Sequence, residues 1–272
     1  MKSRLLVAAV GVPLIFWLTL WAPVWALAWA LAALSGVAAY ELMKCAGATG
    51  AGGPLCWLTV AWALGAVFLQ WARPAWLLPL LILYCLLAFG AAVRRAGEVR
   101  CHHIMACFFA VSAIPYAFSS FLRLSGLGLH RAFLLLPLLF SFASDTGAFF
   151  AGRSLGKHKL APRVSPHKTV EGALGGLAAN ALSGALFALV MNGALDYSIP
   201  YLAIALVGLA CSVVAQLGDL SFSLIKREFG IKDYGRIFLE HGGVLDRFDS
   251  VLFVAPALEV LIHLAGLVQS HG

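Results

Sequence analysis

Nine apolar runs of roughly 17 to 22 residues constrain this chain more than any other feature of its sequence. A helix rises about 1.5 Å per residue, so about 20 apolar residues cross the hydrocarbon core of a bilayer. Only 11% of the 272 residues are charged, whereas soluble domains carry ~25%. The sequence therefore predicts an all-α integral membrane protein with about nine transmembrane helices, at Leu5–Trp21, Val24–Tyr40, Leu55–Trp71, Ala75–Val93, Ile104–Leu122, Ala132–Ala151, Val170–Met191, Ile199–Leu217 and Val251–Val268.

The positions of lysine and arginine predict the orientation of these helices. With the N-terminus in the cytoplasm, sixteen of the nineteen basic residues fall in inside segments, and only Arg73, Arg123 and Arg131 fall outside. Cytoplasmic loops carry such an excess of positive charge. We therefore expect a cytoplasmic N-terminus, and we attribute the net charge of +7 to cytoplasmic loops and anionic ligands instead of nucleic acid.

Polar residues are concentrated in the second half of the chain. Nine of the twelve acidic residues and ten of the nineteen basic residues lie between Asp145 and Asp249. The sequence therefore predicts N-terminal transmembrane anchor helices over residues 1–131 and a C-terminal catalytic transmembrane domain over 132–272. The catalytic loops are expected on the cytoplasmic side.

The first polar segment runs from Asp145 to Gly172 and contains five cations within sixteen residues, among several glycines. On a helix Asp145 would lie roughly 12 Å below Arg153, and an ionisable group at that depth usually faces a polar cavity. Cations and exposed backbone suit a polyphosphate, and Ser165 or Thr169 is a candidate cap for the next helix. The alternative is a basic loop that only follows the charge rule. The candidate substrate-binding residues here are Asp145, Arg153, Lys157, Ser165 and Lys168.

The second polar segment runs from Gly218 to Ser250. On a helix Asp219, Ser223 and Lys226 share one face, and Asp246 and Asp249 share another. Two converging faces of this kind would hold Mg²⁺, which binds one or two carboxylates together with water and phosphates. The alternative is that these aspartates only pair with neighbouring cations at the membrane surface.

The stretch from Ser223 to Asp249 resembles the signature of the phosphatidate cytidylyltransferases (CDP-diacylglycerol synthases). It reads Ser-x-hydrophobic-Lys-Arg, then Lys232-Asp233, then His-Gly-Gly-hydrophobic-x-Asp-Arg-x-Asp ending at Asp249. The segment from Asp145-Thr146 to Glu171-Gly172 looks like the same family's second conserved block. One departure is Leu239-Glu240, which stands where the family usually has Pro-Gly or a similar small pair.

This resemblance implies that a phosphatidate oxygen attacks the α-phosphorus of CTP, with Mg²⁺ and a second cation such as K⁺ as cofactors. Asp219 and Asp246 match the family's metal-binding aspartates. His241 is either a donor to phosphate or a loop-packing residue, and Lys232 and Asp233 either pair or bind substrate. The implied catalytic residues are Asp219, Asp246, Lys226, Arg227, His241 and Arg247, and the implied substrate-binding residues in the second segment are Ser223, Lys232, Asp233 and Asp249.

The implied partners are CTP, phosphatidic acid and the lipid bilayer, without nucleic acid, and a homodimer is left open. We expect a multi-pass protein of a bacterial cell inner membrane. The alternatives are a transporter or channel, a CTP-using enzyme for another lipid phosphate or a polyprenol, and a non-catalytic scaffold. A transporter is disfavoured because the polar groups cluster at one membrane face.

Overall fold

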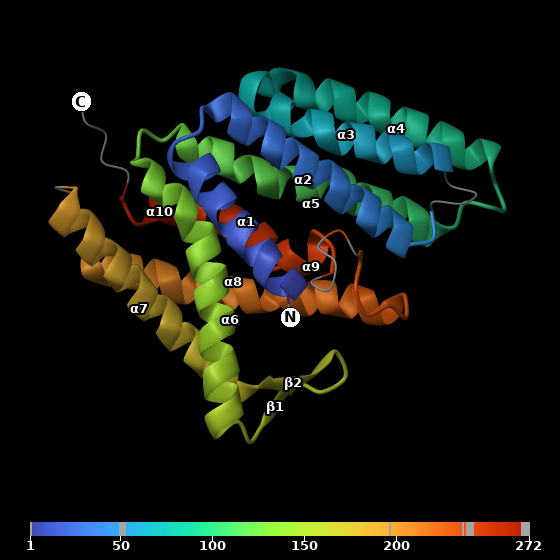
Figure 1. The fold of residues 1–272 in the computed structure, drawn as a ribbon. Coiled ribbons are helices and arrows are strands. Elements are labelled where there is room, and N and C mark those ends of the chain that lie inside the picture. Colours follow the sequence, from blue (N-terminus) through green and yellow to red (C-terminus); the bar gives the residue numbers. More distant parts are fainter. Residues whose placement is uncertain (1, 49–52, 196, 236, 238–241, 268–272) are drawn as a thin grey trace. The chain divides into compact units, whose positions relative to one another are not determined.

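The computed structural model describes residues 2–48, 53–195, 197–235, 237 and 242–267 (Figure 1). Helices make up most of this part of the chain. Their bounds are α1 Lys2–Leu20, α2 Val24–Cys45, α3 Gly53–Ala72, α4 Leu77–Arg94, α5 Cys101–Ser125, α6 Leu136–Leu155, α7 Val170–Ala194, α8 Tyr201–Glu228, α9 Leu245–Phe248 and α10 Val251–Leu264. Short 3₁₀ turns at Pro74–Trp76 and Arg131–Leu135 lead into α4 and α6.

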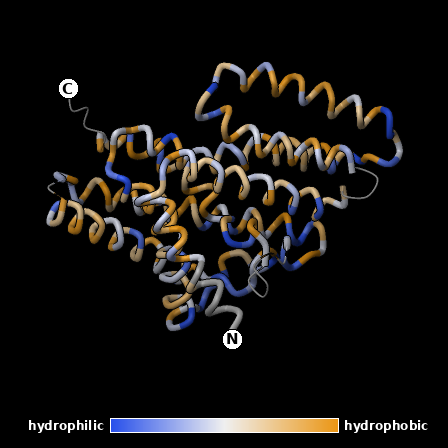
Figure 2. The backbone as a smooth tube through the Cα atoms, turned by 45° about the horizontal axis from the view of Figure 1, so that its top comes forward, coloured by the Kyte–Doolittle hydropathy of each residue, from blue (hydrophilic) through white to orange (hydrophobic). Residues whose placement is uncertain are grey.

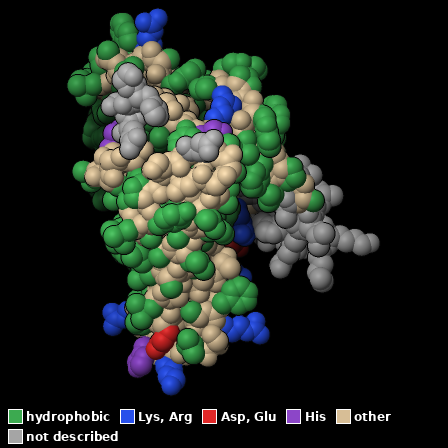
Figure 3. All heavy atoms as spheres, turned by 90° about the vertical axis from the view of Figure 1, so that its left-hand side faces the viewer, with side chains coloured by type: hydrophobic (Ala, Val, Ile, Leu, Met, Phe, Trp, Pro, Cys, Tyr) green, Lys and Arg blue, Asp and Glu red, His purple; other side chains and the backbone are tan. Residues whose placement is uncertain are grey.

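Each of the nine predicted spans coincides with one of these helices. Seven are long and apolar enough to cross a membrane, and α10 and residues 11–20 of α1 are shorter apolar helices. Hydrophobic residues follow the helices in Figure 2 and cover much of the face seen in Figure 3. The chain is thus a helical, multi-pass membrane protein, while nine crossings with a cytoplasmic N-terminus stay a prediction.

The helices form two compact units. Unit 1 comprises Met1–Gly126 and Lys226–Phe248, and unit 2 comprises Leu127–Ile225 and Asp249–Gly272. The first boundary lies close to the predicted one after residue 131, but unit 1 also includes the segment that carries Asp246. The assignment of anchor and catalytic roles to residues 1–131 and 132–272 stays a prediction.

In unit 1, α2, α3 and α5 pack against one another. Small residues on α2, including Ala28 and Ala32, are buried. The Ser35 hydroxyl donates to the Ala63 carbonyl at 2.9 Å, which joins α2 to α3. Because hydrocarbon offers no polar partners, such small residues and interhelical hydrogen bonds are what hold helices together in a membrane.

In unit 2, α6 and α7 are in close contact, and glycines make this possible. A Cβ on Gly147 would meet the side chain of Ala179 and would lie 2.7 Å from the Gly175 carbonyl oxygen. The segment between these helices forms an antiparallel hairpin of β1 (Lys159–Ala161) and β2 (Ser165–Thr169). The all-α prediction did not include this hairpin, because its strands are too short to give a periodic pattern.

Candidate active site

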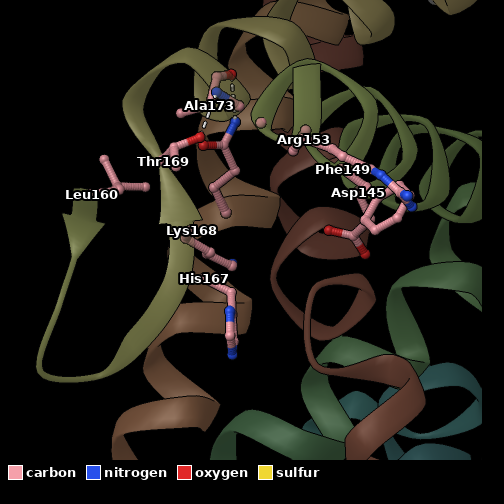
Figure 4. A pocket seen from close by; sticks show the side chains of 12 residues that line it. Asp145, Phe149, Arg153, Leu160, His167, Lys168, Thr169 and Ala173 are labelled. Carbon is pink, nitrogen blue, oxygen red and sulfur yellow. Dashed lines mark hydrogen bonds between the residues drawn. The ribbon is translucent and has the colours of Figure 1, made fainter. Parts of the chain in front are cut away.

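A cavity of about 400 Å³ in unit 2 lies between the C-terminal half of α6, the hairpin and the start of α7 (Figure 4). Asp145, Phe149 and Arg153 of α6 line one side, and His167 and Lys168 of β2 line the other. The remaining lining residues are Ala148, Gly152, Leu160, Thr169, Gly172, Ala173 and Gln216. Asp145, Arg153 and Lys168 were predicted from sequence to bind substrate, and the fold brings them to one cavity.

Thr169 fixes the junction between the hairpin and α7. Its hydroxyl accepts from the Gly172 N–H at 3.1 Å, as expected for a helix N-cap. A Cβ on Gly152 or Gly156 would lie 2.9 Å from the same hydroxyl oxygen. Glycine at positions 152 and 156 thus allows the end of α6 to approach this cap closely. Ser165, the other candidate cap, lies at the start of β2 and is half-buried.

Glu171 ties the end of α6 to the start of α7. Its carboxylate accepts from the backbone N–H of Lys157 at 3.0 Å and of His158 at 3.2 Å, and lies 2.6 Å from the imidazole Nδ1 of His158. These contacts close the turn that leads into the hairpin. The Lys157 side chain itself is exposed.

Lys168 forms an ion pair with Asp219, which joins the cavity to α8. The side chains of Lys168 and Asp219 are 27% and 24% exposed. Helix α8 continues eleven residues beyond the predicted apolar run, so Asp219, Ser223 and Lys226 lie on one helix as the sequence indicated. Residues of α8 up to Ile225 belong to unit 2, and Lys226 begins the second segment of unit 1.

Asp246 is the centre of a second polar cluster, which lies in unit 1. Its Oδ1 accepts from Lys226 Nζ at 3.0 Å, and its Oδ2 accepts from the backbone N–H of Tyr234 at 2.8 Å and of Gly243 at 2.9 Å. Only 6% of the Asp246 side chain and 13% of the Lys226 side chain is exposed. The Lys226 ammonium also lies 5.5 Å from the centre of the Tyr234 ring. Asp246 is therefore held in one orientation by three donors.

The expected helical face shared by Asp246 and Asp249 does not form. Helix α9 ends at Phe248, and Asp249 lies in the turn before α10. Its Oδ1 accepts from the Ser250 N–H at 2.7 Å. Such a local bond between an aspartate side chain and the backbone competes with the hydrogen bonds that would continue a helix. Asp249 is buried in unit 2, where its backbone passes close to Gly218.

The other predicted site residues lie mostly at the surface. Arg227, Arg247, Lys232 and Asp233 are exposed, and Ser223 is half-buried. No ion pair joins Lys232 to Asp233 in the described part of the chain. His241 and the departure at Leu239-Glu240 fall outside the described residues.

A sequence model of the cytidylyltransferase family matches residues 2–265. The chain belongs to this family. Among curated proteins, it is 42% identical to the phosphatidate cytidylyltransferase of Staphylococcus haemolyticus and 41% identical to that of Staphylococcus aureus, over 156 residues in each case. The matched stretch is 57% of this chain and 58% of each relative. The family resemblance drawn from the two polar segments is therefore confirmed.

Glu41 is a polar residue of this family member that sequence reasoning missed. It lies in α2, is 2% exposed, and accepts two backbone hydrogen bonds from the residues just before Asp246. Glu41 and Glu98 are the only acidic residues before Asp145. An acidic residue at the end of an apolar run is costly unless it has a function or a partner, and this signal could have singled it out.

Within the described residues, no group of three or more His, Cys, Asp or Glu side chains is arranged to hold a metal ion. The carboxylates proposed as ligands nevertheless retain free acceptor sites. A carboxylate has about four lone-pair sites. Asp246 uses three of them, and one oxygen of Asp219 faces Lys168. Both side chains thus have the chemistry of Mg²⁺ ligands that share their coordination with phosphate oxygens and water.

Proposed function

We propose that this chain transfers the cytidylyl group of CTP to phosphatidic acid, giving CDP-diacylglycerol and pyrophosphate for phospholipid synthesis. The reaction takes place at the cytoplasmic face of a bacterial inner membrane. A phosphate oxygen of phosphatidic acid forms a bond to the α-phosphorus of CTP. The bond between that phosphorus and the oxygen that bridges the α- and β-phosphates breaks, and pyrophosphate leaves with the electron pair.

The observation that carries this proposal is the ion pair of Lys168 and Asp219 beside a cavity lined by Arg153 and Asp145, in a member of the cytidylyltransferase family. The names of the curated relatives support the choice of CTP and phosphatidate. Phosphoryl-type transfer requires alignment and charge neutralisation more than a covalent nucleophile. A cavity with two cations and a carboxylate supplies both requirements.

Asp219 and Asp246 are the proposed ligands of Mg²⁺, accompanied by a second cation such as K⁺. When bound, the metal neutralises phosphate charge and orients the triphosphate. The chain's own cations would do the rest. Lys168 exchanges Asp219 for a phosphate oxygen, and Arg153, Lys226, Arg227 and Arg247 bind the remaining phosphate oxygens.

The direct test is pyrophosphate release by purified protein supplied with Mg²⁺, CTP and phosphatidic acid. Release is expected with CTP and not with ATP or UTP, and dCTP tests recognition of the ribose. Lys168→Gln should abolish most of the release. Lys159→Gln is the matched control, because Lys159 is an exposed lysine of the same hairpin that does not line the cavity.

The same assay separates the alternatives. Release with a polyprenyl phosphate but not with phosphatidic acid would assign another lipid acceptor. No release with any lipid, together with nucleotide-independent solute flux in proteoliposomes, would favour a transporter.

Cysteines introduced near Ser165 and Tyr234 should be labelled only from the cytoplasm, and labelling from the opposite side would refute the proposed orientation. Cross-linking in the membrane tests the proposed homodimer.

A further inference from the structure

Glu41 connects α2 to a loop far away in the sequence. One of its carboxyl oxygens accepts from the Val244 N–H at 3.0 Å, and the other accepts from the Leu245 N–H at 2.9 Å. These residues and Glu41 all belong to unit 1. Val244 and Leu245 are buried as well, so water does not replace these two acceptors. Each oxygen of the Glu41 carboxyl group thus accepts a hydrogen bond from the backbone of this loop.

The loop is shaped to receive this carboxyl group. A Cβ on Gly235 or on Gly243 would collide with the Glu41 carboxyl oxygens. Glycine at both positions lets the loop backbone close around the side chain. A larger residue at either position would force the carboxyl group and the loop apart.

The same loop holds Asp246. The Gly243 N–H donates to Asp246 Oδ2, while the next two N–H groups along the chain donate to Glu41. Three consecutive backbone donors are thus divided between two carboxyl groups. The orientation of the Gly243 peptide, and with it one of the bonds to Asp246, depends on where Glu41 holds Val244 and Leu245.

We propose that Glu41 is a positioning residue for Asp246: it anchors the backbone of residues 243–245 so that the Asp246 carboxylate is preformed for its ligand. This inference rests on the proposed function, in which Asp246 binds the divalent cation. In this proposal Glu41 acts on Asp246 through the loop backbone and not by direct contact with substrate or metal. An ionisable residue in an apolar helix is expensive, and its two backbone bonds here are the compensation.

The test is Glu41→Gln, which keeps the side-chain shape but replaces one acceptor oxygen with a donor that faces an N–H group. Ser35→Ala is the matched control. It removes another buried hydrogen bond of α2, which joins Ser35 to the Ala63 carbonyl of α3 instead of to the loop. Hydrogen–deuterium exchange of peptides covering 242–248 is measured in detergent, along with the rate of pyrophosphate release and its dependence on Mg²⁺ concentration.

In Glu41→Gln we expect faster exchange over 242–248, a roughly 10-fold to 100-fold lower kcat, and a higher Mg²⁺ concentration for half-maximal activity, because small misplacements of a ligand-binding group have large kinetic effects. Ser35→Ala should leave all three unchanged. Wild-type exchange and Mg²⁺ dependence in a folded Glu41→Gln protein would overturn the inference.

Two further arms keep the result interpretable. If Glu41→Gln does not fold, Gly235→Ala tests the same contact from the loop side, with the carboxyl group intact, and the same three changes are expected. If the wild-type protein releases no pyrophosphate, the proposed function fails, while the exchange measurement still decides whether Glu41 anchors the loop.

Discussion

Two lysine–aspartate pairs among the described residues differ in how tightly each carboxylate is held. In unit 2, Asp219 and Lys168 each keep about a quarter of their side-chain surface exposed. In unit 1, Asp246 and Lys226 are 6% and 13% exposed, and Asp246 accepts two further backbone N–H groups. The first pair is partly exposed, whereas the second is buried within a network of hydrogen bonds.

This difference separates two roles that the sequence presented as equivalent. An ion pair that water reaches contributes less to stability than a buried one, because water screens both charges. A buried pair with satisfied hydrogen bonds is costly to break, because the remaining charge is left without compensation. We therefore expect the Asp219 pair to rearrange when a triphosphate binds, and the Asp246 cluster to stay as it is.

The largest effect is expected for Asp246→Asn. It leaves Lys226 buried without a counter-charge, so the free energy of unfolding should fall by about 3–5 kcal/mol. Pyrophosphate release should fall roughly 10²-fold or more, because a proposed metal ligand is lost. Thermal unfolding in detergent and the release assay measure the two effects.

The control for that change is the double variant Lys226→Met with Asp246→Asn, which should regain part of the stability but none of the activity. If the Asp246→Asn protein is as stable as the wild type, the buried pair of Asp246 and Lys226 does not stabilise unit 1 more than the pair of Asp219 and Lys168 stabilises unit 2.

Asp219→Asn should separate activity from stability. We expect a loss of roughly 10²-fold in release, with a change in the free energy of unfolding below about 1 kcal/mol, because the pair with Lys168 is partly exposed. The same two assays apply. Destabilisation equal to that of Asp246→Asn would remove the proposed difference between the pairs.

Gly147→Ala should destabilise unit 2 by about 1–3 kcal/mol through overpacking of α6 against α7. Its Cβ would meet Ala179 and the Gly175 carbonyl oxygen. Gly193→Ala is the control on α7, since its Cβ would enter open space. Thermal unfolding checks both variants. Equal unfolding midpoints would show that α6 and α7 can move apart at Gly147 without loss of stability.

The smallest effect is expected for Thr169→Ala, which removes the N-cap of α7 beside the cavity and should cost about 1 kcal/mol. Thr169→Ser retains the hydroxyl and should behave like the wild type in thermal unfolding. An identical loss in both variants would point to the lost methyl group of Thr169, not to the cap.

Features that depend on local sequence could be predicted. The apolar runs locate the helices because about 20 apolar residues suffice for a span. The i, i+4 and i+7 spacing placed Asp219, Ser223 and Lys226 on one face of a helix, and α8 does extend through them. Thr169 was one of two candidate caps and is the one used. The two polar segments identified the family, which the match over residues 2–265 confirms.

The tertiary structure alone decided which polar groups meet. Glu41 and Val244 are 203 residues apart, and no periodicity relates positions so distant. The break at Asp249 arises because its side chain bonds the next backbone N–H, an outcome that helical spacing ignores. Short-range preferences of the chain thus determine the helices and the chemistry available, whereas the pairing of buried charges depends on packing that brings distant segments together.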